Sequence, residues 1–261
     1  MRIAVKFAYN GRKFHGFARQ PNVATIEEKI IKVLIKHGLI EDVIESKLRY
    51  ASRTDKGASA FSNVIAFNTR SFKKNIIKNI SLEYKDIVFY GVKEVELEFN
   101  PRYAKQRIYR YYLPKCCLDI ESLIATTSMF TGKHDFSNFA RVESNKDPIR
   151  TINNIVFTED GNFIRVDFSA QTFLWHQIRR IISAILRIEK GKLEKDQIKK
   201  ALSKPDKRVN FGLAPAEPLI LKDIIYDFDF EYDENFLHRL NELKQKIIKN
   251  LDVTSVKSPK S

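Results

Sequence analysis

The sequence predicts an α+β protein made of two similar halves. Segments that alternate apolar and polar residues, typical of strands, recur along the 261 residues, and stretches with helical apolar spacing lie between them. Hydrophobic residues make up 43% of the chain, which is enough for a globular core. Asn100 and Pro101 break the pattern. We therefore expect an N-terminal α+β half over residues 1–100, a C-terminal α+β half over residues 101–251 and a disordered tail over residues 252–261.

The first hundred residues have the order strand, helix, strand, helix, strand. Residues 2–9 alternate in polarity as a half-buried strand does, and a turn signal follows at Asn10 and Gly11. Thr25 and Glu28 match a capping box at the start of a helix that ends near Gly38. The remaining expected elements are a strand at residues 64–67, a helix beginning near Phe72 and a strand at residues 86–95.

The second half has a similar mixture of strands and helices, without a repeat at the level of sequence. Residues 107–113 are rich in aromatic, β-prone residues, and residues 154–158 and 162–169 predict a hairpin. An apolar stripe predicts a long helix over residues 173–191, and residues 132–141 have the composition of a loop. We also expect helices at residues 119–130, 195–203 and 233–250 and a strand at residues 218–228.

The charge of the chain predicts a polyanionic partner. Lys and Arg number 46 against 32 Asp and Glu, giving a formal net charge of +14. Nucleic acid is the usual partner of such a chain, although charge alone does not choose among RNA, DNA and a membrane surface. Cys116 and Cys117 are the only cysteines, and the five histidines lack metal-ligand spacing. Without an apolar signal sequence or a membrane-length apolar run, we expect a cytoplasmic protein that holds no metal and enters no membrane.

The most reactive stretch that the sequence offers runs from Ala51 to Thr69, ASRTDKGASAFSNVIAFNT. It places Asp55 between Arg53 and Lys56, in a turn that contains a glycine. A nearby positive charge lowers the pKa of a carboxyl group and keeps it ionised, so Asp55 is a candidate nucleophile. The alternative is an aspartate that only caps the turn.

The segment RTDKG resembles the R-T-D-x-G motif of the TruA family of tRNA pseudouridine synthases. Further stretches resemble motifs of that family in the family's order: FHGFARQP (14–21), YRYYL (109–113), HDFSNFAR (134–141), PIRTI (148–152), FLWHQIRRI (173–181) and GLAPAEPLIL (212–221). The resemblance implies a pseudouridine synthase fold, in which two similar halves have mixed, largely antiparallel sheets joined across a central RNA-binding cleft. It also implies a reaction without cofactor or metal.

The activity implied is isomerisation of uridine to pseudouridine in the anticodon arm of tRNA, at positions thirty-eight to forty. Asp55 resembles the catalytic aspartate, which acts as a nucleophile or general base on a flipped-out uridine. Arg179 resembles the arginine that pairs with that aspartate, and Tyr111 resembles the active-site tyrosine that stacks on the uracil. The alternatives are a surface arginine along the apolar stripe and a core tyrosine. Bacterial relatives act as homodimers, so a homodimer is expected.

The same resemblance names residues for substrate binding. Arg53 resembles the residue that fills the space left by the flipped nucleotide; the alternative is a phosphate contact. Lys56, Tyr109 and Leu219 are the other candidates. Tyr109 and Tyr111 share one face of a strand, so alternation does not separate them. Leu219 is as well suited to a strand core as to a base pocket.

The chain departs from the family pattern at several positions. Ala58 and Ser59 stand where Val-His is usual, Phe17 where Trp is common, and Pro218 where Gly is usual. Pro218 constrains the backbone near the pocket and bears on substrate choice. Two other functions fit the same residues: a pseudouridine synthase with a different RNA target, and a non-catalytic RNA-binding protein whose aromatic residues stack on bases.

Overall fold

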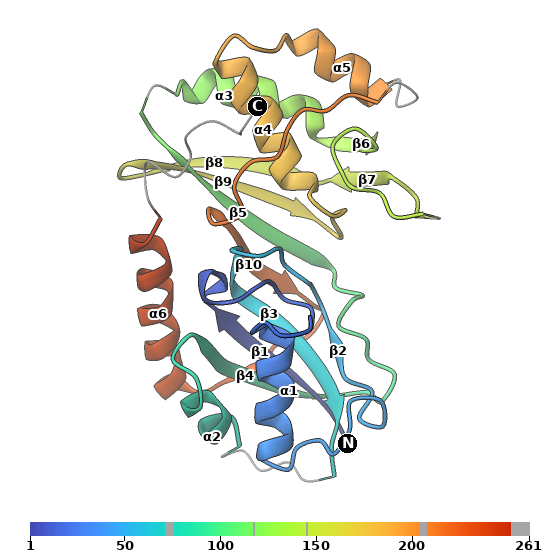
Figure 1. The fold of residues 1–261 in the computed structure, drawn as a ribbon, viewed down its shortest axis with the longest axis vertical. Helices are drawn as coiled ribbons and strands as arrows, with labels where there is room; N and C mark the ends of the chain where they lie inside the picture. Colours follow the sequence, from blue (N-terminus) through green and yellow to red (C-terminus); the bar gives the residue numbers. More distant parts are fainter. Residues whose placement is uncertain (71–75, 117, 145, 204–207, 252–261) are drawn as a thin grey trace. The chain divides into compact units, whose positions relative to one another are not determined.

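The computed structural model describes residues 1–70, 76–116, 118–144, 146–203 and 208–251 (Figure 1). The chain separates into two compact units. Unit 1 contains residues 1–105 and 220–250, and unit 2 contains residues 106–219 and Leu251. Each unit combines helices with mostly antiparallel strands, which confirms the predicted α+β class. The predicted tail at residues 252–261 and Phe72 lie outside the described residues.

The sheet of unit 1 has the strand order β11-β4-β1-β3-β10, with β2 paired to β3. β1 runs antiparallel to both of its neighbours, whereas β10 runs parallel to β3 with Ile220 opposite Ser59. The bounds are β1 (Arg2–Tyr9), β2 (Arg49–Tyr50), β3 (Ser59–Asn68), β4 (Ile87–Val95), β10 (Leu219–Ile225) and β11 (Glu231–Tyr232).

Three α-helices belong to unit 1: α1 (Ile26–Lys36), α2 (Ile76–Leu82) and α6 (Glu234–Lys249). The Thr25 hydroxyl accepts a hydrogen bond from the backbone N–H of Glu28, so the predicted cap of α1 is present. α6 packs against β4, β1 and β3 with Phe236, Leu240, Leu243 and Ile247 buried. Residues 220–250, which the sequence analysis placed in the second half, therefore group with the first hundred residues.

The prediction that residues 2–9 form a half-buried strand is wrong, because every residue of β1 is buried. β1 lies inside the sheet, between β3 and β4, and its polar side chains are satisfied internally. The guanidinium of Arg2 donates to the Phe99 carbonyl at 2.7 Å and to the Asn68 side chain at 2.9 Å. The polar residues that alternate along β1 therefore have buried hydrogen-bonding partners, and they do not form a face of the strand that is exposed to solvent.

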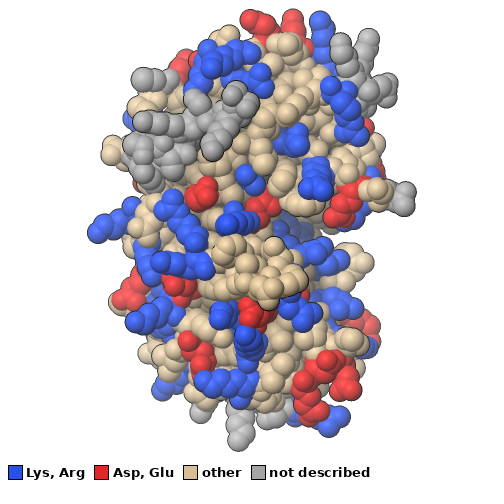
Figure 2. All heavy atoms as spheres, viewed as in Figure 1, with Lys and Arg blue, Asp and Glu red and all other residues tan. Residues whose placement is uncertain are grey.

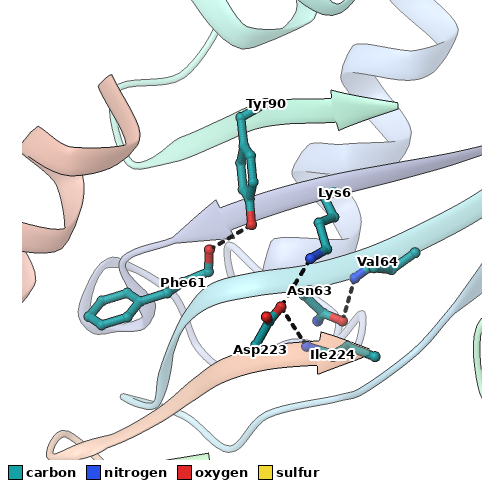
Figure 3. Close-up of polar contacts among 7 residues, drawn as sticks. All are labelled: Lys6, Phe61, Asn63, Val64, Tyr90, Asp223 and Ile224. Atoms are coloured by element: carbon teal, nitrogen blue, oxygen red, sulfur yellow. Dashed lines mark hydrogen bonds and ion pairs between the residues drawn. The ribbon is translucent and has the colours of Figure 1, made fainter. Parts of the chain in front are cut away.

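Lys6 shows how such a charge is accommodated (Figure 3). Its Nζ lies 3.0 Å from Oδ1 of Asp223 on β10, and the same oxygen accepts the backbone N–H of Ile224 at 2.8 Å. The Phe230 ring lies 5.2 Å from the Lys6 ammonium. Since β3 lies between β1 and β10, this ion pair spans β3 and joins the first segment of unit 1 to its second segment, residues 220–250.

Unit 2 is built on the antiparallel sheet β5-β9-β8 and the small sheet β6-β7. The hairpin predicted near residues 154–169 is confirmed, with Gly161 in its turn. Residues 132–135 form a strand paired with residues 149–152, so the prediction of a loop over residues 132–141 is wrong for that part. The strands are β5 (Gln106–Pro114), β6 (Gly132–Asp135), β7 (Ile149–Ile152), β8 (Asn154–Asp160) and β9 (Phe163–Ala170).

The helices of unit 2 are α3 (Ile120–Thr127), α4 (Gln177–Glu189) and α5 (Lys195–Ser203). α4 begins four residues later than predicted. His176 has a left-handed backbone (φ +66°), and the backbone N–H of Arg141 donates to the Trp175 carbonyl at 2.8 Å. These two features hold residue 175 outside the helix, so Trp175 and Arg179 do not lie on one helical face. Among the described residues, no helix combines the length and apolarity needed to cross a membrane.

The Lys6–Asp223 ion pair yields a stability prediction with a matched control. We expect Asp223→Asn to lower the free energy of unfolding by about 1–2 kcal/mol, because it leaves the buried Lys6 ammonium without its counter-charge. Asp227 pairs with Lys105 at 2.9 Å, but its side chain is 82% exposed against 39% for Asp223. Asp227→Asn should therefore change that free energy by less than about 0.5 kcal/mol. Urea denaturation followed by circular dichroism measures both; equal effects would contradict the prediction.

Candidate active site

Asp55 lies in a tight turn between β2 and β3. The backbone N–H of Ala58 donates to the Asp55 carbonyl at 3.1 Å, and Gly57 adopts φ +89°, a left-handed conformation that glycine tolerates best. Asp55 itself is half-buried, whereas Arg53 and Lys56 are exposed. The turn thus combines a partly accessible carboxylate with two exposed cations, as the sequence predicted.

A second loop, formed by residues 11–17, packs against this turn and is hydrogen-bonded to it. Phe17 N–H donates to the Thr54 carbonyl at 3.2 Å, on the residue that precedes Asp55. Gly16 (φ +94°) passes so close that a Cβ there would lie 3.4 Å from the backbone nitrogen of Lys56. The backbone on each side of Asp55 is therefore packed against or hydrogen-bonded to one neighbouring loop.

The side chain of Thr54 is anchored from the core. Tyr9, fully buried at the end of β1, lies with its hydroxyl 2.8 Å from the Thr54 hydroxyl. Phe17 packs between Tyr9 and Tyr50, with ring centroids at 6.1 and 5.0 Å. Phe17, which replaces the usual tryptophan, thus fills an aromatic cluster beneath the turn.

Of the two residues that depart from the family pattern, Ala58 and Ser59, Ser59 has a structural role through its side chain. Ser59 Oγ accepts the backbone N–H of Gly11 at 3.0 Å, so its hydroxyl joins the two loops. A Cβ built on Gly11 would lie 1.9 Å from the Ala58 carbonyl oxygen, which only a glycine at position 11 avoids. Tyr9, Thr54 and Ser59 were not predicted to support the site. Their signal in the sequence was weak: Thr54 and Ser59 are polar residues close to Asp55.

In unit 2, Tyr111 and Arg179 both bind the segment GLAPAEPLIL. Tyr111 on β5 is fully buried, and its hydroxyl donates to the Pro215 carbonyl at 3.1 Å. Arg179 on α4 donates from Nε to the Ala214 carbonyl at 2.7 Å, and Ala214 N–H donates back to the Arg179 carbonyl at 3.1 Å. Burial raises the pKa of Tyr111, and the Arg179 guanidinium opposes this shift less strongly. The structure therefore brings these two predicted residues together.

Tyr109 and Tyr111 have different environments although they share one face of β5. Tyr109 is half-buried, and its ring meets Phe173 edge-on at 5.4 Å. Leu219 is buried at the start of β10, and its N–H donates to the Ala216 carbonyl at 3.0 Å. The Pro218 carbonyl accepts the Tyr112 N–H at 3.1 Å, and proline keeps the carbonyl that this bond with β5 needs.

The predicted site residues thus fall into two groups. Unit 1 carries Arg53, Asp55 and Lys56 on one turn, and in unit 2 Tyr111 and Arg179 donate hydrogen bonds to neighbouring carbonyls, of Pro215 and Ala214. The pairing of Asp55 with Arg179 remains a prediction that joins the two groups. Figure 2 shows Lys and Arg side chains spread over the viewed face with acidic side chains among them, in keeping with the net charge of +14.

Comparisons with known proteins match the chain to one family. A family model described as tRNA pseudouridine synthase matches residues 127–227. A protein of Thermococcus sibiricus named tRNA pseudouridine synthase A is 44% identical over 236 residues, which cover 89% of this chain and 88% of the relative. Proteins of the same name from Pyrococcus furiosus and Methanothermobacter thermautotrophicus are 40% and 36% identical, covering 92% and 95% of this chain and 89% and 90% of their own.

The anchoring of the Asp55 turn can be tested with a double-mutant cycle. We expect Tyr9→Phe and Thr54→Val each to destabilise the protein, because each removes one partner of a buried hydrogen bond. The double variant should lose less than the sum of the two, with a coupling free energy of about 0.5–1.5 kcal/mol. Urea denaturation of the four proteins measures it. Strictly additive losses would show that the two hydroxyls do not interact.

Proposed function

Because the chain belongs to the family of tRNA pseudouridine synthase A, we propose that it isomerises uridine to pseudouridine in tRNA. The observation that carries the proposal is the Asp55 turn, which holds a half-buried carboxylate in a rigid backbone between two exposed cations. A half-buried carboxylate so placed is reachable by a nucleotide that has left its helix.

The reaction needs one group that works on the ribose. The bond between C1′ and N1 breaks, the uracil rotates, and C1′ bonds to C5; the base loses a proton at C5 and gains one at N1. Asp55 serves this exchange either by attacking C1′ as a nucleophile or by removing a sugar proton as a general base. Both roles require the ionised carboxylate and a turn that does not shift during the rotation.

Arg179 and Tyr111 complete the proposed site from unit 2. In this proposal Arg179 is the partner of Asp55, as the family resemblance implies, and it orients the carboxylate by a charge-assisted hydrogen bond. Its own guanidinium is held through Nε by the Ala214 carbonyl. Tyr111 is the residue that the family resemblance assigns to stacking on the extruded uracil, a role that requires the fully buried ring to become exposed when RNA binds. Because burial raises its pKa, its phenol stays protonated at neutral pH, which favours stacking and hydrogen-bond donation over proton removal.

The remaining predicted residues have supporting roles in the proposal. Arg53 fills the space left by the flipped nucleotide, and Lys56 contacts phosphate; both are exposed as this requires. Tyr109 adds a partly exposed ring beside the base, and Leu219 lines the base pocket. The anticodon arm as target, a homodimer and a cytoplasmic location belong to the same proposal.

The proposal predicts that Asp55→Asn abolishes isomerisation, with a loss of at least about a thousandfold, while tRNA affinity changes by no more than a few-fold. Asparagine keeps the shape of the side chain but is neither nucleophile nor base at neutral pH. Asp227→Asn, an exposed substitution in the same unit, is the control and should retain full activity. Chemical mapping of pseudouridine in tRNA measures turnover; equal turnover by Asp55→Asn would remove Asp55 from catalysis.

The same mapping with the wild-type protein decides between the candidate functions. Pseudouridine in the anticodon arm supports the proposal, and pseudouridine elsewhere in the RNA indicates a different target. If the protein binds tRNA but forms no pseudouridine, it is an RNA-binding protein without this activity.

Binding should also depend steeply on salt. With a net charge of +14, the contacts to phosphate release counterions, so the logarithm of the association constant should fall linearly as the logarithm of the salt concentration rises. Filter binding of tRNA at several salt concentrations measures the slope. A flat response would show that phosphate contacts do not drive binding.

A further inference from the structure

Trp175 is the only tryptophan of the chain, and its side chain is 44% exposed. The position of this side chain is set by the backbone around it and not by burial in a core. The Trp175 carbonyl accepts the N–H of Arg141 at 2.8 Å, the two residues form an isolated β-bridge, and His176 turns the chain in a left-handed conformation. A large aromatic ring is thus held at the surface of unit 2 by local structure.

Arg141 covers part of this ring. Its guanidinium lies 4.3 Å from the Trp175 ring centroid, a cation–π distance, and Arg141 is exposed. The His176 ring lies 4.9 Å from that of Trp175. An indole with a planar cation on it is the kind of surface on which unpaired bases of RNA stack, because every base has a π-face and both groups stack on it.

A further cation, Arg180, lies close to Trp175 in the chain. Arg180 follows on the first turn of α4, where its backbone N–H donates to the His176 carbonyl at 3.0 Å. Its side chain is half-buried; burial lowers its pKa, and no acidic group offsets that shift. Among the described residues, none accepts a hydrogen bond from Arg180 Nε. A phosphate would supply the missing negative charge.

We propose that Trp175 and Arg141 form a stacking platform for an unpaired nucleobase of the RNA substrate, apart from the uridine that reacts. The inference rests on the proposed function, since it takes RNA as the ligand, but it does not involve Asp55. Unpaired bases occur in loops and not in stems, so the platform selects RNA that presents a loop.

The single tryptophan makes the platform directly measurable. Titrating the wild-type protein with a stem-loop RNA of anticodon-arm sequence should quench the emission of Trp175 and saturate at the concentration at which binding saturates. A fully paired RNA duplex with the same number of phosphates should bind without that quenching. If the stem-loop saturates the protein with no change in emission, or if the duplex quenches equally, the platform is refuted.

Variants separate stacking from charge and from packing. Trp175→Leu should weaken stem-loop binding by about 5- to 100-fold, whereas Trp175→Phe, which keeps an aromatic face, should lose much less. Arg141→Lys keeps the charge but loses the planar group, and should weaken binding by about two- to fivefold. The matched control is Lys199→Arg, an exchange of one exposed cation for another on α5, which should leave affinity unchanged. Equal affinity for wild type and Trp175→Leu contradicts the inference.

Failure of the platform and failure of the proposed function give different results. If the wild-type protein forms pseudouridine but Trp175 emission does not respond to RNA, only the platform is wrong. If stem-loop RNA quenches Trp175 but no pseudouridine forms, the platform stands and the proposed function is wrong.

Discussion

The Asp55 turn depends on close backbone packing at three glycines, and the placement of Arg53, Asp55 and Lys56 depends on that turn. Gly57 and Gly16 have φ angles of +89° and +94°, and Gly11 passes so close to Ala58 that a side chain there would overlap the carbonyl. These positions let two loops share one set of backbone contacts around Asp55. The position of the Asp55 backbone is therefore set by these contacts, which need glycine at each of the three positions.

Much of the fold could be predicted because periodicity is a local signal. The helix at residues 26–36 and the hairpin near residues 154–170 follow from spacing, caps and turn residues. The predictions that were wrong concerned residues whose partners lie far away in the sequence. The burial of Lys6 needs Asp223, and the strand at residues 132–135 needs residues 149–152. The start of α4 was misplaced because the bridge between Arg141 and Trp175 leaves no mark in the apolar stripe.

The candidate site likewise has a part that local sequence patterns predict and a part that depends on long-range contacts. Arg53, Asp55 and Lys56 are neighbours in the chain, so the sequence alone indicated a charged turn. The hydrogen bond between Tyr111 and Pro215 joins residues 104 positions apart, and no sequence pattern near either residue predicts it. There the resemblance of ordered motifs to a family supplied the residues, and the structure supplied the backbone carbonyls that hold them.

The composition of unit 1 has a consequence for how the protein is made. The strand β10 and the helix α6 leave the ribosome only after all of unit 2 has been synthesised, because residues 106–219 separate them from the first part of unit 1. At ordinary rates of translation this takes on the order of ten seconds. Throughout that interval β3 has an unpaired edge and Lys6 lacks its carboxylate, so the nascent chain is open to intermolecular strand pairing. The half that carries Asp55 therefore gains β10 and α6 only after residues 106–219 have been synthesised, although the contacts of the Asp55 turn with Tyr9 and with the loop at residues 11–17 lie within residues 9–59.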